Sequence, residues 1–266
     1  MNIAPASVRA RAFDAWATDY ERYRPGYPDA LFDLISERLG LPAAPRAVDL
    51  GAGTGKVARS GAARGWEVTA VEPGEAMLDV LRDRAAAEGA TVRSVRARAE
   101  DTGLPSATFD VALAGEAYHW FNARAALAEM GRIVRPLGGI ALFWSVVDDS
   151  FAPIADERTL TAEHGIAGPD TLARPGPRPE TGDSIRAAGS FGEPAFVQLP
   201  YVRHMTGAQY LGLVRTKSHL RTAPPDIQER FSGAFEAMLA SHGVGPAARV
   251  DVPYVVDCWI ARRTDA

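Results

Sequence analysis

Short apolar runs alternate with amphipathic segments along most of the chain. The apolar runs, interpreted as strands, lie at residues 47–50, 67–72, 91–98, 109–115, 139–147, 195–203 and 252–261. Apolar residues at helical spacing mark 29–40, 56–64, 123–134, 152–163 and 206–221, and further helices are expected after residues 74 and 225. Strands that alternate with helices predict an α/β fold around a largely parallel sheet.

Local signals set the ends of several elements. Asp29 is expected to cap the helix over 29–40, and Gly40 to end it. Residues 136–139 are expected to form a turn before the fifth strand. Glycine and proline crowd residues 165–183, which predicts an exposed loop or lid.

The segment Asp49–Gly55 carries the strongest candidate chemistry. An acid ends the first strand, and Gly51, Gly53 and Gly55 follow at alternate positions. A strand, a glycine turn and a helix N-terminus together form a cradle for a polar or anionic small molecule. A P-loop is excluded because Leu50 stands at its first glycine and Val57 at its hydroxyl position, and Lys56 occupies the third glycine of a dinucleotide fingerprint. On this motif alone, a glycine turn in an unrelated α/β protein is an alternative interpretation.

A second acid, Glu72, ends the next strand. Its distance from the glycine turn is close to the ~20 residues at which a carboxylate meets ribose hydroxyls in nucleotide-binding βαβ units. A carboxylate can accept hydrogen bonds from both ribose hydroxyls. The pair of motifs therefore indicates a nucleoside-containing ligand.

Composition narrows the class further. The 266 residues carry a net charge of -4, which argues against a nucleic-acid binder. The single cysteine, Cys258, excludes an intrachain disulfide and a cysteine-based zinc site, and it is expected to be a packed thiol. No compact spacing of metal ligands, secretory signal or membrane span is evident, so we expect a cytoplasmic protein without a metal or a membrane partner.

The D-x-G-x-G-x-G pattern resembles motif I of the class I S-adenosylmethionine (SAM)-dependent methyltransferases. The resemblance continues in Tyr20–Pro28, in Ala99-Glu100, in Tyr118–Phe121 and in the Arg135–Gly139 step. Within that family, the sequence is similar to the type 11-like small-molecule branch that includes trans-aconitate-type enzymes. It implies a Rossmann-like, doubly wound, seven-stranded sheet in the order 3-2-1-4-5-7-6, with an antiparallel last strand, helices on both faces and a C-terminal cap insertion.

The resemblance also implies a division of the chain and a set of cofactor contacts. Residues 1–45 would form a lid, 46–150 the SAM-binding core and 151–266 the cap and final strands of one compact domain. Implied cofactor residues are Tyr20, Arg24, Asp49, Gly51, Ala52, Gly53, Thr54, Gly55, Glu72, Pro73, Met77, Ala99, Glu100, Gly115, Glu116 and Ala117. The N-terminal aromatics could instead pack on the core, and Glu100 could be an acid near a helix cap.

The acceptor is expected at the loop after the fourth strand, since ligands of open α/β sheets bind where the strand order reverses. Candidate pocket residues are Trp16, Tyr23, Tyr118, His119, Trp120, Trp144, Arg215 and His219. His119 and Glu116 are candidate catalytic groups, with His119 either a base or part of the pocket wall. Arg215, Lys217, His219 and Arg221 either recognise an acidic molecule or form a solvated helix face.

These observations predict methyl transfer from SAM to a small-molecule acceptor, on oxygen or carbon, by in-line displacement, with S-adenosylhomocysteine as product. A carboxylate or hydroxyl of a metabolite is the favoured acceptor. A non-catalytic SAM- or nucleotide-binding protein is an alternative. A nucleic-acid methyltransferase is disfavoured by charge and by Gly115–Tyr118 at the position of an [ND]-P-P-[YF] motif. Acceptor identity and oligomeric state do not follow from the sequence.

Overall fold

The computed structural model describes three parts of the chain, residues 16–24, 26–167 and 173–264. Its contacts divide the chain into two units. The core unit comprises Pro25–Ser145, Gly176–Leu199 and Val256–Ala266, and the cap unit comprises Met1–Arg24, Val146–Pro175 and Pro200–Val255. Residues 168–172 of the predicted loop and residue 25 of the segment Tyr20–Pro28 lie outside the described parts.

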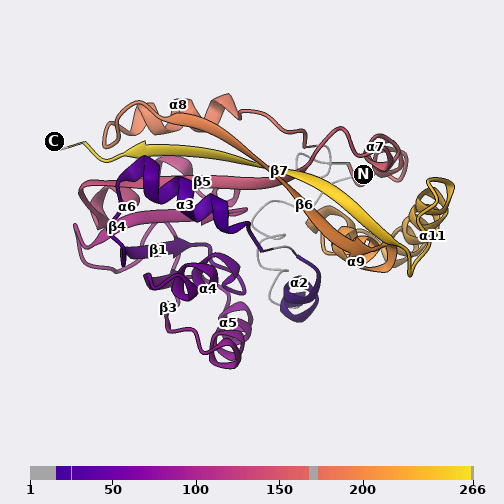
Figure 1. The fold of residues 1–266 in the computed structure, drawn as a ribbon, viewed down its shortest axis with the longest axis horizontal. Helices are drawn as coiled ribbons and strands as arrows, with labels where there is room; N and C mark the ends of the chain where they lie inside the picture. Colours follow the sequence, from indigo (N-terminus) through magenta and orange to yellow (C-terminus); the bar gives the residue numbers. More distant parts are fainter. Residues whose placement is uncertain (1–15, 25, 168–172, 265–266) are drawn as a thin grey trace. The chain divides into compact units, whose positions relative to one another are not determined.

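A seven-stranded mixed sheet in the order β3-β2-β1-β4-β5-β7-β6 confirms the predicted topology (Figure 1). Its strands are β1 (Arg46–Leu50), β2 (Glu67–Val71), β3 (Val92–Val95), β4 (Phe109–Gly115), β5 (Val134–Val147), β6 (Ala195–Thr206) and β7 (Arg249–Arg262). The neighbours β3-β2, β2-β1, β1-β4 and β4-β5 are parallel. The strand order therefore reverses between β1 and β4, and the loops that follow these two strands meet at one edge of the sheet.

The core unit surrounds its part of the sheet with helices on both faces (Figure 1). They are α3 (Asp29–Leu39), α4 (Lys56–Ala63), α5 (Glu75–Glu88), α6 (Ala123–Ile133) and α8 (Pro179–Ala188), with the 3-10 turn η2 (Tyr118–Trp120) after β4. Strands β1 and β4 are buried almost throughout, as continuous apolar runs covered on both faces should be. Gly40 ends α3 in the left-handed conformation, as predicted, but Pro28 rather than Asp29 holds the N-cap position.

The cap unit has its own apolar core. Its helices are α2 (Ala17–Tyr23), α7 (Pro153–Glu163), α9 (Gly207–Arg215), α10 (Ser218–Arg221) and α11 (Pro225–Ser241). Phe231, Phe235 and Tyr210 pack at the centre of this core, and each is at most 1% exposed. Helix α2 packs closely on α9. There is no room for a side chain at Gly212, where an added Cβ would clash with the Tyr23 ring.

Three predicted elements differ from the structure. Residues 136–139 are not a turn: β5 runs through them, with a register shift between Phe109 and Val111 of β4 and with Leu137 at a φ of 65°. Glycine is required there because a Cβ on Gly139 would lie 2.7 Å from the Ala261 carbonyl oxygen.

The other two differences concern helices. The predicted loop at 165–183 is wrong over its last residues, because α8 begins at Pro179, where proline fits the first helical position. The predicted helix at 206–221 is divided into α9 and α10 at Thr216 and Lys217. There the Thr216 hydroxyl donates to the Leu213 carbonyl oxygen at 2.6 Å, and Lys217 takes an extended conformation.

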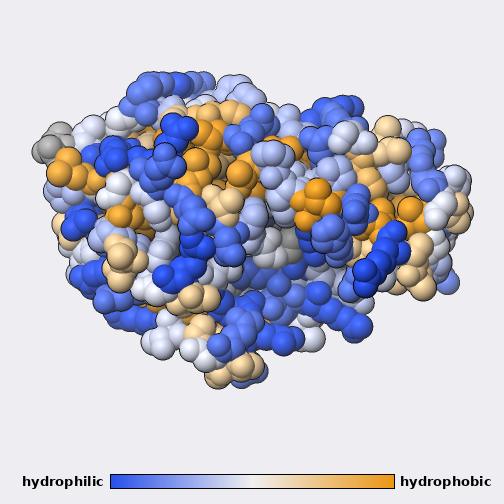
Figure 2. Space-filling model, viewed as in Figure 1, coloured by the Kyte–Doolittle hydropathy of each residue, from blue (hydrophilic) through white to orange (hydrophobic). Residues whose placement is uncertain are grey.

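The described surface is mostly polar. The face drawn in Figure 2 shows hydrophilic residues with groups of apolar residues between them. Leu137 and Val202 are the large hydrophobic residues that stand exposed among the described ones, at 66% and 50%. Within the same described parts, no helix has the length and hydropathy needed to cross a bilayer, and no group of three or more metal-ligating side chains converges.

Candidate functional site

The turn after β1 requires its three glycines. Gly51, Gly53 and Gly55 all have positive φ, at 67°, 55° and 83°. The N–H groups of Gly51 and Ala52 both donate to the Val71 carbonyl oxygen, which holds the turn against the end of β2. A side chain at any of the three positions would be strained, and at Gly51 and Gly55 it would also meet the side chains of Ala117 and Leu81.

Thr54 lies within the same turn. Its side chain is buried, and its hydroxyl oxygen has no hydrogen-bond partner among the described residues. Buried polar atoms are usually paired, so this one is an exception that the turn tolerates in this state.

Glu72 and the glycine turn lie in direct contact. One carboxylate oxygen of Glu72 accepts the Gly53 N–H at 3.0 Å, and the other accepts the Gly74 N–H at 2.9 Å. The half-buried carboxylate is therefore held at a defined orientation beside the turn. A carboxylate oxygen can accept more than one hydrogen bond.

Asp49 lies below the turn and is almost completely buried, at 1% exposed. Its carboxylate accepts the N–H of Ala58, near the start of α4, at 3.1 Å. Burial raises the pKa of Asp49 to about 7, the Ala58 N–H lowers it in part, and the negative charge of Glu72 raises it further. This acid therefore titrates close to neutral pH.

The implied cofactor residues Ala99 and Glu100 adjoin the loop after β4. Glu100 accepts the Asn122 N–H at 2.8 Å and pairs with Arg98 at 3.2 Å. Burial alone would raise the pKa of Glu100, but these two donors lower it below its ordinary value. Ala99 is buried beside it. At the start of α5, Met77 is buried and Pro73 is exposed.

The loop after β4 lies against the glycine turn. A Cβ added to Gly51 would meet the Ala117 methyl at 2.7 Å, and one added to Gly115 would meet the Tyr27 hydroxyl at 2.8 Å. Between them, Glu116 has a φ of 55°, which is unusual for a residue other than glycine.

The strained Glu116 links the ends of two strands. Its N–H donates to the Phe143 carbonyl oxygen at 2.9 Å, and its carboxylate accepts the Ser145 N–H at 2.6 Å. It thereby extends the pairing of β4 with β5 beyond the last regular bonds. Backbone strain of this kind clusters at functional sites.

His119 is fixed by Trp144 of β5. The indole N–H of Trp144 donates to His119 Nδ1 at 3.1 Å, and the Trp120 ring lies 4.9 Å from the His119 ring. Since an indole N–H can only donate, Nδ1 accepts, and the proton of neutral His119 sits on Nε2. Tyr118 completes this aromatic cluster, with its ring 6.4 Å from Trp144.

The remaining predicted residues belong to the cap unit, and their contacts there are internal. Arg24 donates to the Thr216 hydroxyl at 2.9 Å, and Arg215 donates to the Ser232 hydroxyl at 3.0 Å. His219 is only 4% exposed. Of the cations at 215–221, His219 is buried and Lys217 and Arg221 are partly buried in ion pairs, whereas Arg215 is exposed, so a solvated position is found at Arg215 and not along the whole segment.

The N-terminal aromatics are also held within the cap unit. The Arg221 guanidinium lies 5.0 Å from the centre of the Trp16 ring and pairs with Asp19 at 2.8 Å. The guanidinium of Arg24 lies 5.4 Å from the centre of the Tyr20 ring. These contacts attach α2 to α9 and α10.

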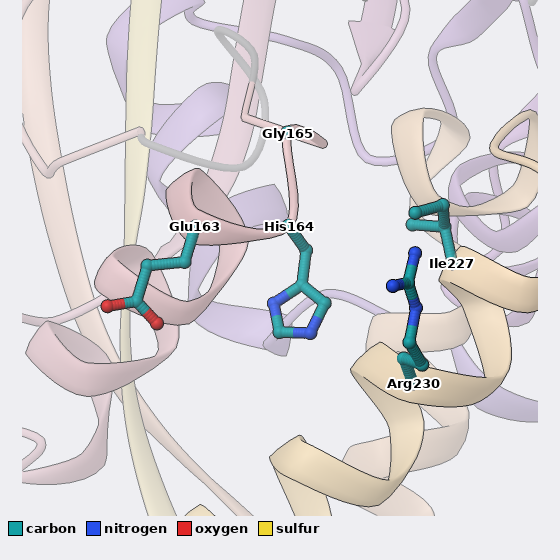
Figure 3. Close-up of a pocket in the computed structure, with 5 residues that line it drawn as sticks. All are labelled: Glu163, His164, Gly165, Ile227 and Arg230. Carbon is teal, nitrogen blue, oxygen red and sulfur yellow. The ribbon is translucent and has the colours of Figure 1, made fainter.

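A cavity of about 450 Å³ opens between the end of α7 and α11. Figure 3 shows that the side chains of His164 and Arg230 face one another across it, while Glu163 points away. His164 Nδ1 bonds the Leu160 carbonyl oxygen, and Arg230 pairs with Asp226 on its own helix. None of the predicted site residues lines this cavity.

The fold and the site define a class: an α/β protein with a glycine turn, a ribose-type carboxylate and an aromatic loop at the switch point of its sheet. The sequence model of the methyltransferase domain matches residues 48–142. An uncharacterized methyltransferase of Mycobacterium tuberculosis is 31% identical over 241 residues, covering 90% of each chain. The solved structure described as a type II methyltransferase from Anaeromyxobacter dehalogenans is 27% identical, with a TM-score of 0.65 over 92% of this chain and 100% of that one.

The chain therefore belongs to the class I SAM-dependent methyltransferase family, and the protein is an enzyme. A further relative is the malonyl-[acyl-carrier protein] O-methyltransferase of Serratia marcescens, 36% identical over 110 residues and 41% of each chain. The likeness to trans-aconitate-type enzymes stays a prediction.

Proposed function

We propose that the protein methylates a small-molecule acceptor, on oxygen or carbon, with the cofactor seated on the glycine turn. The observation that carries this proposal is the contact of Glu72 with Gly53 and Gly74, which fixes a carboxylate beside the glycine turn. Such a carboxylate suits the two ribose hydroxyls of SAM, and Ala99 and Glu100 suit its adenine. Asp49 offers negative charge below the turn toward the amino-acid end.

SAM, when bound, supplies a methyl group already activated by its sulfonium, so the protein's task is alignment and choice of acceptor. The loop 115–121 serves this task because Ala117 touches the glycine turn at one end and His119 is fixed to Trp144 at the other. The O-methyltransferase among the relatives supports oxygen as the receiving atom.

His119 is better placed to donate a hydrogen bond than to accept a proton. In the neutral ring Nδ1 is occupied by the Trp144 N–H, and Nε2 carries hydrogen. Taking up a proton at Nδ1 would break the bond to the indole. A carboxylate acceptor needs no base at neutral pH, so this arrangement favours it over a hydroxyl acceptor.

Calorimetry with SAM and with S-adenosylhomocysteine tests the cofactor site. The wild type should bind both, and Glu72→Gln should weaken both because an amide cannot accept two backbone N–H groups with its two ends. Glu67→Gln is the matched control, since Glu67 lies exposed at the other end of β2. Equal affinities of the two variants, or no heat with wild type, would contradict the assignment.

Transfer itself is tested with SAM that carries a labelled methyl group and a cell extract as acceptor. We expect label in a small-molecule fraction that resists nuclease and protease. Label recovered only in nucleic acid or protein would refute a small-molecule acceptor without affecting the cofactor site.

A further inference from the structure

Arg178 is a cation whose hydrogen-bonding capacity is not used. It precedes α8, and its side chain is 24% exposed. Its Nη1 is buried without a hydrogen-bond partner, and the described residues accept no other hydrogen bond from its guanidinium. Arginine presents five N–H donors in a rigid fork, so a mostly buried guanidinium with none engaged is uncommon.

Two neighbours hold this guanidinium in place. Its central carbon lies 4.4 Å from the centre of the Trp144 ring, a cation–π contact. On the other side, the Asp257 carboxylate lies 3.6 Å from Nη1, which is too far for a hydrogen bond. Asp257 is fully buried and already accepts the Gln198 amide at 2.9 Å and the Gly176 N–H at 3.0 Å. It attracts the arginine without consuming its donors.

The same Trp144 ring ties Arg178 to the predicted acceptor loop. The indole N–H bonds His119, while a face of the indole carries the guanidinium. The Tyr118 ring contacts Trp144 edge-on, and the buried Tyr118 hydroxyl makes no hydrogen bond among the described residues. Burial raises the pKa of Tyr118, an effect only partly offset by the neighbouring Ser184 hydroxyl, so Tyr118 stays a neutral donor.

We propose that Arg178 recognises a carboxylate of the acceptor beside Trp144. This inference rests on the proposed function and extends it, since it assigns the acceptor an acidic group and identifies the residue that binds it. A planar carboxylate matches the guanidinium fork with two parallel hydrogen bonds, which a lysine cannot provide. Arg178 then has the role that the sequence suggests for Arg215, Lys217, His219 and Arg221. Those four residues belong to the cap unit and make contacts within it.

Matched pairs of acids and amides test this recognition. Benzoate and phenylacetate, each with its primary amide, are titrated by ligand-observed NMR into protein saturated with S-adenosylhomocysteine, at constant ionic strength. Charge-assisted hydrogen bonds predict that wild type prefers each acid over its amide by about tenfold to a hundredfold. Arg178→Met should abolish the preference and Arg178→Lys should retain part of it.

Arg186→Met is the matched control. Arg186 lies on α8, the helix that Arg178 precedes, but it is exposed and paired with Glu193. It should keep the preference of the wild type. If Arg178→Met does not fold, Arg178→Gln replaces it, with a thermal melt as the check on folding.

The proposal is overturned if the acids bind wild type no better than the amides, including no binding of either, or if the preference survives loss of Arg178. Failure of wild type to bind S-adenosylhomocysteine would instead refute the proposed function. The two failures are therefore distinguishable.

Discussion

The buried Asp49 below the glycine turn should make the protein less stable as the pH rises toward neutral. Its pKa rises from the ordinary value of 3.8 to about 7 in the folded protein, chiefly because burial disfavours the charged carboxylate. Between these two values the folded state holds a proton that the unfolded state has lost. The contribution of Asp49 to stability is therefore fully present below its ordinary pKa of 3.8, is lost as the pH rises to about 7, and changes little above that.

The size of the effect follows from the pKa change. The complete change corresponds to about 4 kcal/mol, of which about 2.5 kcal/mol falls between pH 5 and pH 8. Asp49 is only 1% exposed, so solvent screening does little to reduce this figure.

Urea unfolding of wild type and Asp49→Asn between pH 5 and pH 8 measures this change in the free energy of unfolding. The asparagine keeps the shape and can still accept the Ala58 N–H, but it does not titrate. The free energy of unfolding of wild type should fall by about 2.5 kcal/mol more than that of the variant over this range. Asp83→Asn, an exposed change in α5 of the same unit, should leave the profile of the wild type unchanged. Parallel profiles for wild type and Asp49→Asn would refute the reasoning.

The same proton should report cofactor binding. If the cationic amino-acid end of the cofactor lies near Asp49, binding favours the carboxylate and releases its proton. Calorimetry at pH 6 in buffers of different ionisation enthalpy should then detect release of up to about one proton in wild type and none in Asp49→Asn. Equal proton release by both proteins would show that the proton does not come from Asp49 and would contradict a place for the cofactor near it.

Three further changes have defined outcomes. Glu157→Ala leaves a partly buried lysine ammonium and a buried tyrosine hydroxyl without their shared partner and should cost about 3–5 kcal/mol in urea unfolding, whereas Glu163→Ala, exposed on the same helix, should change little. Gly182→Ala places a Cβ 2.8 Å from a buried indole ring and should cost about 1–3 kcal/mol, whereas Gly233→Ala, in a helix with open space around it, should be neutral or stabilising in a thermal melt. His119→Gln should lower kcat/KM without removing the acidic limb of its pH profile, and loss of that limb would restore His119 as a base.

The cofactor side of the site could be predicted because its parts are local in the sequence. Three glycines at alternate positions imply positive φ, and the structure has it at each of them. The acid at the end of β2 lies next to the turn because parallel neighbouring strands end at the same edge of a sheet. The sheet order is the one that the resemblance to the methyltransferase family implies, and it is confirmed.

The differences arise where tertiary contacts override local signals. Gly138 and Gly139 are typical of a turn, yet they form part of a strand because neighbouring backbones approach too closely for a side chain. Pro179 is typical of a loop, but it is also a good first residue for a helix. The spacing of the cations at 215–221 suggests a solvated face, and no pattern in the sequence pairs Lys217 with Glu157.

His119 and Trp144 are candidate pocket residues on the sequence alone, but Arg178 and Asp257 could not be predicted, because they come from separate elements that meet them only in the folded chain. His119 follows β4, Trp144 lies in β5, Arg178 precedes α8 and Asp257 lies in β7, and each contacts the next in this series. A change in any one of them can alter the acceptor without touching the glycine turn or Glu72. Relatives of this fold can therefore keep one cofactor and diverge in substrate, and Arg178 is the position in this series at which charge selects the acceptor.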